Sequence, residues 1–109
     1  MDSFPSNLTR KNCISLMEQK QLELTKVTRD DFYKIIMKGI NDCEKEVTLR
    51  FNDKLWDNHR IKVAGELLEI FGEINISTIQ NKCIVTKCTT DKNNLPDKIK
   101  EIRIQFCTE

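Results

Sequence analysis

The clearest pattern in the chain lies between residues 46 and 76. Apolar and polar residues alternate over 46–51, and over 55–71 the apolar residues recur with helical spacing until Gly72. A second alternation follows at 74–76. Alternation with a period of two predicts a half-buried strand, and apolar residues three and four apart predict one face of a helix. The segment therefore predicts strand, helix and strand, and its length fits a crossover between parallel strands.

Two further helices are predicted before this unit. Thr9 is a favoured capping residue for a helix that begins near Arg10, although Gln21 interrupts the apolar face of this first helix. That face consists of Cys13, Ile14, Met17 and Leu24.

A second helix is predicted to start at the run from Thr28 to Asp31, which resembles a capping box with Asp in place of Glu. Gly39 lies inside this helix at a cost of about 1 kcal/mol relative to Ala, and its missing side chain leaves room for another element to approach closely. The apolar residues with helical spacing are Phe32, Ile35, Ile36, Ile40 and Cys43.

The third helix, over 55–71, is expected to be capped by Asn52 or Asp53 and to end at Gly72, a residue suited to the left-handed conformation after a helix. Residues 80–82 form a polar segment short enough for a hairpin turn. A third strand is expected over 83–88, followed by a loop over 89–97 and a final strand over 102–106.

These patterns predict a single α+β domain over residues 9–109, preceded by a flexible tail at 1–8. The order is α-α-β-α-β-β, with a four-stranded mixed sheet that carries its helices mainly on one face. The first two strands are expected to be a parallel pair joined through the third helix, and the others an antiparallel meander. The expected core sets Val47, Leu49, Phe51, Ile76, Ile102, Ile104 and Phe106 against Ile35, Ile36, Ile40, Val63, Leu67 and Phe71.

Composition limits the classes of function. The 109 residues are 39% hydrophobic and 32% charged, with a net charge of +1. This balance lacks the excess of Lys and Arg that usually indicates binding to nucleic acid or to an anionic membrane. No apolar run is long enough to span a bilayer, and no secretory signal precedes the domain. We therefore expect no membrane partner and a cytoplasmic, unsecreted protein.

The five cysteines have no paired spacing, so we expect reduced thiols that pack as small apolar residues. They are Cys13, Cys43, Cys83, Cys88 and Cys107. Cys83 and Cys88 are five residues apart on one predicted strand and therefore lie on opposite faces, which does not fit a zinc site. We predict no metal and no cofactor.

Candidate catalytic residues are few. His59 is the only histidine, and it lies at the start of a predicted helix with no nearby nucleophile. Asp97 and Glu101 with Arg103 resemble the acidic and basic residues of metal-dependent nucleases, but the final lysine of that pattern is missing. A turn followed by an edge strand explains the same residues more simply. We expect no enzymatic activity, and a small metal-dependent enzyme using Asp97 and Glu101 ranks last.

Three residues are candidates for contact with another protein or with a second copy of the chain. Trp56 can anchor a partner, since Trp is frequent in interface hot spots, or it can close one end of the core. Tyr33 lies off the predicted core faces, and Leu24 lies on the interrupted face of the first helix. The alternative is nucleic-acid binding by basic residues of the C-terminal sheet, namely Lys87, Lys98, Lys100 and Arg103.

The run from Asp53 to Arg60 (DKLWDNHR), continued from Glu66 to Gly72 (ELLEIFG), resembles a pattern in small proteins of large cytoplasmic DNA viruses. Those proteins likewise have two N-terminal helices, a strand, a helix ending in Gly and an apolar strand. The resemblance covers most of the chain, and its motifs are structural. It implies a viral origin and an α+β fold, and it transfers no catalytic residue. The leading hypothesis is a non-enzymatic protein-binding or assembly module, such as a small virion component or accessory protein.

Overall fold

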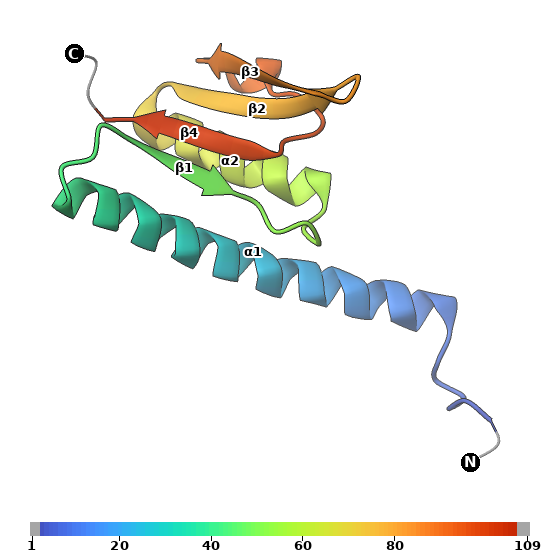
Figure 1. The fold of residues 1–109 in the computed structure, drawn as a ribbon. Coiled ribbons are helices and arrows are strands. Elements are labelled where there is room, and N and C mark those ends of the chain that lie inside the picture. Colours follow the sequence, from blue (N-terminus) through green and yellow to red (C-terminus); the bar gives the residue numbers. More distant parts are fainter. Residues whose placement is uncertain (1–2, 107–109) are drawn as a thin grey trace.

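The computed structural model describes residues 3–106, which form one small α+β domain with two helices and a four-stranded antiparallel sheet (Figure 1). The α+β class and the four-stranded sheet are confirmed, but the order is α-β-α-β-β-β: the chain has two α-helices where three were predicted, and the predicted order gave only three of the four strands. Cys107 and Glu109, at the end of the predicted domain, lie outside the described residues. The elements are α1 (Arg10–Asn41), β1 (Glu46–Arg50), α2 (Asp57–Phe71), β2 (Ile74–Gln80), β3 (Cys83–Thr89), the 3-10 helix η1 (Lys92–Asn94) and β4 (Glu101–Gln105).

The two predicted N-terminal helices are one continuous helix, α1, of 32 residues. Thr9 caps it as expected, because its side chain accepts a hydrogen bond from the backbone N–H of Asn12. Thr28 does not begin a second helix. Its hydroxyl donates to the carbonyl of Leu24 at 2.7 Å, which is the usual way in which a threonine is accommodated inside a helix. No proline or glycine interrupts this region, so nothing forces a break there.

The sheet has the order β1-β4-β2-β3, and every neighbouring pair is antiparallel, so the prediction of a mixed sheet is wrong. Strands β1 and β2 run in the same direction, but β4 lies between them. Ile102 in β4 pairs with Leu49 on one side and with Ile76 on the other. The central position buries β4 from both sides, which suits its fully buried Ile102 and Ile104.

The hairpin between β2 and β3 is confirmed. Its two connecting residues, Asn81 and Lys82, both have positive φ angles, of 50° and 67°. Two successive positive φ angles are typical of the type I′ turn, whose twist matches that of the flanking strands.

One face of the sheet is covered by α2, and α1 runs along the outer edge next to β1 (Figure 1). The predicted core is confirmed in part: Ile36, Phe71 and Phe106 are half-buried, but Ile35 and Ile40 are 39% and 49% exposed. Because α1 lies beside the sheet edge and not over the sheet, only a narrow stripe of it is buried. The buried apolar residues are Phe32, Val47, Leu49, Phe51, Leu55, Val63, Ala64, Leu67, Leu68, Ile74, Ile76, Ile99, Ile102 and Ile104.

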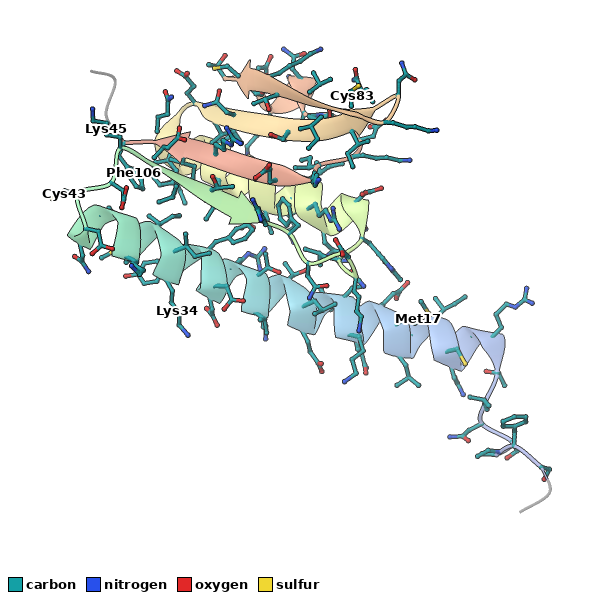
Figure 2. The ribbon with its side chains drawn as sticks, in the orientation of Figure 1. Met17, Lys34, Cys43, Lys45, Cys83 and Phe106 are labelled. Carbon is teal, nitrogen blue, oxygen red and sulfur yellow. The ribbon has the colours of Figure 1, made fainter. Side chains whose placement is uncertain are left out.

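Gly39 marks the closest approach between α1 and the sheet. A Cβ atom added there would collide with Cγ1 of Val47 and would lie 3.3 Å from Cε2 of Phe106. The expected close approach of another element is therefore confirmed, and the element is β1. Figure 2 shows Phe106 at this end of the molecule, beside the turn that carries Cys43 and Lys45.

The start of α2 is held by residues that the sequence patterns did not indicate. Neither Asn52 nor Asp53 caps the helix, because the cap position is Trp56, whose side chain makes no capping hydrogen bond. Arg60 instead ties the segment before α2 to the segment before β4. Its guanidinium donates to three backbone carbonyl oxygens: Nε to Leu55 at 2.8 Å, Nη2 to Asn52 at 2.8 Å and Nη1 to Ile99 at 2.7 Å. The other end is as predicted, since Gly72 adopts the left-handed conformation with φ of 77°.

Candidate protein-binding surfaces on the long helix

The N-terminal part of α1 extends beyond the sheet as an arm, which we define as residues 10–20 (Figure 1). The molecule measures 65 × 33 × 24 Å, and its radius of gyration is 17.3 Å. A compact chain of this length has a radius of gyration of about 13 Å. Apolar side chains of the arm are exposed, among them Leu16 and Met17, and Figure 2 shows Met17 well away from the sheet. The arm thus presents apolar surface that this domain does not cover.

A groove of about 370 Å³ separates α1 from α2, and its walls are almost entirely apolar. We call it the α1–α2 groove. Tyr33 and Ile70 are 64% and 70% exposed along it, whereas Phe32 and Val63 belong to the core beneath. The full set of lining residues is Arg29, Phe32, Tyr33, Ile36, Val63, Glu66, Leu67, Ile70 and Phe71.

An ion pair joins the two helices at this groove. Arg29 donates to both carboxylate oxygens of Glu66, with Nε to Oε2 at 2.8 Å and Nη2 to Oε1 at 2.6 Å. These hydrogen bonds lower the pKa of Glu66 below its ordinary value of 4.5 and raise the pKa of Arg29. A bidentate pair of this kind fixes the relative position of two side chains, so it holds the walls of the groove in place.

A second groove lies on the opposite side of α1, between that helix and the end of β1. We call it the α1–β1 groove. Leu24 and Val27 line it together with Asp31 and Ile35 from the following turns of α1, and Arg50 completes it from β1. Leu24 is nine residues from Tyr33, which at about 100° per residue places the two side chains on opposite sides of the helix.

The three predicted partner-binding residues are therefore not brought together. Tyr33 lies in the α1–α2 groove and Leu24 in the α1–β1 groove. Trp56 lies at the cap of α2, is 37% exposed, and has its ring centre 6.3 Å from that of His59. Its backbone N–H donates to Oε1 of Gln21 at 2.8 Å, so the residue is also part of the joint between α1 and α2.

The four predicted nucleic-acid-binding residues do not form one basic face. Lys87 in β3 pairs with Ile76, and Arg103 in β4 pairs with Asn75, the next residue along β2. Because successive residues of a strand point to opposite faces, Lys87 and Arg103 lie on opposite faces of the sheet. Lys98 and Lys100 are exposed in the segment that leads into β4.

The residues considered for catalysis differ in their exposure to solvent. Asp97 is exposed, whereas Glu101 is buried, with its Oε2 3.7 Å from Nε of Arg50. His59 is half-buried in the first turn of α2. Among residues 3–106, no three His, Cys, Asp or Glu side chains gather in an arrangement that would hold a metal ion.

The thiol of Cys88 has a specific neighbour, because its Sγ donates to Oε1 of Glu73 at 2.9 Å. This hydrogen bond to the carboxylate raises the pKa of the Cys88 thiol. A raised pKa lowers the thiolate fraction of Cys88 at a given pH. The register places Cys88 opposite Asn75 and Cys83 opposite Gln80, which confirms that the two thiols lie on opposite faces of β3.

Two surface residues of the grooves were missed by the sequence patterns. Ile70 lies off the apolar stripe of α2, and Val27 lies between the two helices that had been expected in place of α1. The sequence did contain a signal for Ile70, because an isoleucine outside the apolar stripe of an amphipathic helix is expected to be exposed.

Comparison with known proteins adds no family to this description. No family model matches the chain. No curated protein matches it significantly, and no solved structure is significantly similar to it. Neither of the two α-helices described in residues 3–106 combines the length and apolar character needed to cross a membrane. The resemblance to proteins of large cytoplasmic DNA viruses stays a prediction.

Proposed function

We propose that the protein is a non-enzymatic protein-binding or assembly module, and that the α1–α2 groove receives an apolar part of its partner. The observation that supports this proposal is the exposure of Tyr33 and Ile70 on either side of a groove with apolar walls. Tyr is enriched at protein interfaces because its ring provides apolar contact and its hydroxyl remains hydrogen-bonded at the wetter rim.

The ion pair between Arg29 and Glu66 supports the same proposal. It holds α1 and α2 together at the groove, so the lining residues are positioned before a partner arrives. Binding to a preorganised surface avoids part of the entropy cost of ordering side chains at an interface. The occupant of this groove is therefore expected to be a protein surface with one or two large apolar side chains.

The experiment compares proteins captured by the tagged chain with those captured by Tyr33→Glu and by Ile70→Glu. Both substitutions place a charge on the groove at exposed positions, so the domain should stay folded. Lys26→Glu is the matched control, since Lys26 is an exposed residue of α1 that lines neither groove. After nuclease treatment, mass spectrometry should find partners with the native chain and with the control but not with the two groove variants.

An identical set of captured proteins from all four chains would overturn the role of the groove. The sequence resemblance makes virus-infected cells the source in which to look for the partner. A protein component of the virion, captured in a groove-dependent way, would support an assembly role.

Nucleic-acid binding is the alternative function. A gel shift at low ionic strength tests it, because binding through phosphate contacts weakens steeply as salt is added. Binding that is lost on replacing Lys98 and Lys100 by Glu would favour this alternative over a protein-binding module.

A further inference from the structure

We propose that α1 pairs with α1 of a second copy of this chain, antiparallel and side by side, so that residues 16–20 of each arm lie beside the α1–β1 groove of the other copy. This surface is distinct from the α1–α2 groove, because the two lie on opposite sides of the helix. The proposal therefore goes beyond the function proposed above and does not depend on it.

The surface begins as a line of side chains along α1, which we call the Lys20–Asp31 line. At about 100° per residue, its members lie within about 50° of one direction on the helix, well away from buried residues such as Thr25 and Phe32. All of them are exposed except Leu24, which is half-buried. In chain order the line is Leu16, Lys20, Leu24, Val27, Asp31 and Ile35.

The line is complementary to its own reversed copy. When two α1 helices run antiparallel with their midpoints side by side, Lys20 of each comes to the level of Asp31 of the other. In the same arrangement Leu24 faces Val27, and Leu16 lies at the level of Ile35. Because of the two-fold symmetry each of these contacts is made twice, as expected for a self-complementary interface. Within the line, apolar residues pair with apolar residues and the two charges pair with each other, while Lys34 of the same groove comes to the level of Met17.

The charges also select the direction of pairing. In a parallel pair with the same registration, Lys20 would face Lys20 and Asp31 would face Asp31, and like charges at close range destabilise association. Neither residue is committed elsewhere in the described structure. Lys20 has one long contact with Glu23, at 3.4 Å, between side chains that are both mostly exposed, and an ion pair of this kind contributes little.

The shape of the chain supports the same occupant. The arm has exposed apolar side chains, and short helices without tertiary contacts are marginally stable in water. The α1–β1 groove contains Leu24, Val27, Asp31 and Ile35, which are four of the six members of the line. Full antiparallel overlap brings residues 16–20 of one copy alongside residues 31–35 of the other, so the contact covers part of the arm and one end of this groove.

The size of the contact indicates the protein concentration at which the dimer should dissociate. A helix of 32 residues is about 48 Å long and about 10 Å wide, so a side-by-side pair has a smaller contact than a standard stable interface of about 800 Å² per partner. We therefore expect a dimer that dissociates in the micromolar range, and sedimentation equilibrium from about 1 to about 300 μM covers that range.

The test is a charge-reversal series on the full chain. Lys20→Glu and Asp31→Lys each replace two attractive contacts by two repulsive ones and should weaken the dimer by about tenfold or more. The double variant Lys20→Glu with Asp31→Lys restores opposite charges at both contacts and should return to within about threefold of the native affinity. Lys26→Glu and Asp30→Lys are matched controls, since they make the same charge changes on exposed positions of α1 away from the line.

Two outcomes would overturn the proposal. One is a monomer at every concentration up to about 300 μM, well above the range in which a specific micromolar dimer forms. The other is a dimer whose affinity responds equally to the line variants and to the controls, or in which the double variant is no better than the single ones. Circular dichroism verifies that each variant keeps its helix. Neither outcome bears on the α1–α2 groove, because Tyr33→Glu and Ile70→Glu change that groove and are scored by partner capture.

Discussion

The side-chain amide of Gln21 bridges α1 to the segment that leads into α2. Its Oε1 accepts a hydrogen bond from the backbone N–H of Trp56 at 2.8 Å, and its Nε2 donates to the backbone carbonyl of Lys54 at 2.8 Å. Gln21 is itself buried. One polar residue of the long helix therefore satisfies two backbone groups next to a helix start that has no side-chain cap.

Gln21→Ala should lower the free energy of unfolding by about 1–3 kcal/mol, because the N–H of Trp56 and the carbonyl of Lys54, in part-buried hydrogen bonds, both lose their partner. Gln19→Ala is the control, since Gln19 is exposed and its replacement should change stability by less than about 0.5 kcal/mol. Urea denaturation of both variants is the measurement. Equal stability of the two variants would show that water replaces the Gln21 amide without cost.

Gly39→Ala and Gly65→Ala form a matched pair with opposite expected signs. Both are glycines inside helices, where alanine is favoured by about 1 kcal/mol. At Gly39 a Cβ would collide with Cγ1 of Val47, a buried side chain, so we expect a net destabilisation of about 1–3 kcal/mol. At Gly65 the nearest atoms are Cε of Lys92 at 3.8 Å and Cδ1 of Leu95 at 3.9 Å, which are ordinary contacts, so we expect stabilisation of up to about 1 kcal/mol.

Thermal unfolding of these two variants beside the native chain gives the sign directly. A Gly39→Ala protein at least as stable as the native one would contradict the tight contact between α1 and β1.

Arg60→Lys should cost about 1–3 kcal/mol of stability even though the charge is kept. A lysine ammonium cannot reach the carbonyls of Leu55, Asn52 and Ile99 in the way that a planar guanidinium does, so backbone acceptors lose their donors. Arg103→Lys is the control, because Arg103 is an exposed residue of β4. A loss of stability in the control equal to that of Arg60→Lys would contradict a specific role for the hydrogen bonds of the Arg60 guanidinium.

The ion pair between Arg29 and Glu66 predicts a pH dependence. The pKa of Glu66 is lowered in the folded state, so its contribution to stability is present above the ordinary value of 4.5 and is lost as the pH falls through the lower folded-state value. Glu66→Gln should be less stable than the native protein by up to about 1 kcal/mol at neutral pH, a small value because both side chains are partly exposed and screened by solvent.

The difference between native protein and Glu66→Gln should shrink as the pH is lowered well below 4.5, since a protonated Glu66 resembles glutamine. Denaturant unfolding at about pH 7 and about pH 3 measures it. A difference that is constant or that grows in acid would contradict the assignment of the shift to Arg29.

Local periodicity predicted most elements correctly. The alternation of Val47 and Leu49 and of Ile102 and Ile104, and the stripe that includes Val63 and Leu67, all mark buried positions. Periodicity works here because β1, β4 and α2 each bury one face against a single core. The left-handed end of α2 at Gly72 was equally predictable, since glycine adopts a positive φ without a steric penalty.

The long helix was harder to predict because it contacts the body through polar and small residues. Its buried stripe consists of Gln21, Thr25, Thr28, Phe32 and Gly39, and a pattern based on hydrophobicity detects only one of the five. Gln21 was interpreted as an interruption of the apolar face, whereas it is the most specific contact of that face. The exposed apolar residues of α1 show that hydrophobicity along a helix does not by itself mark contact with the core.

Strand order was beyond the reach of local patterns as well. Each strand resembles a half-buried strand in isolation, and only the pairing of Ile102 with both Leu49 and Ile76 places β4 between β1 and β2. The grooves share this difficulty, because each is formed by α1 and a distant segment such as α2 or the end of β1.

The central position of β4 affects how the chain folds during its synthesis on the ribosome. Strands β1 and β2 are made early, yet neither has its shared neighbour until residues 101–105 have left the exit tunnel. Until then the nascent chain holds two strand edges, the apolar face of α2 and the long helix without a finished sheet to receive them. Edges of this kind recruit other chains. The domain is therefore expected to fold late and in one step, when β4 pairs with β1 and β2.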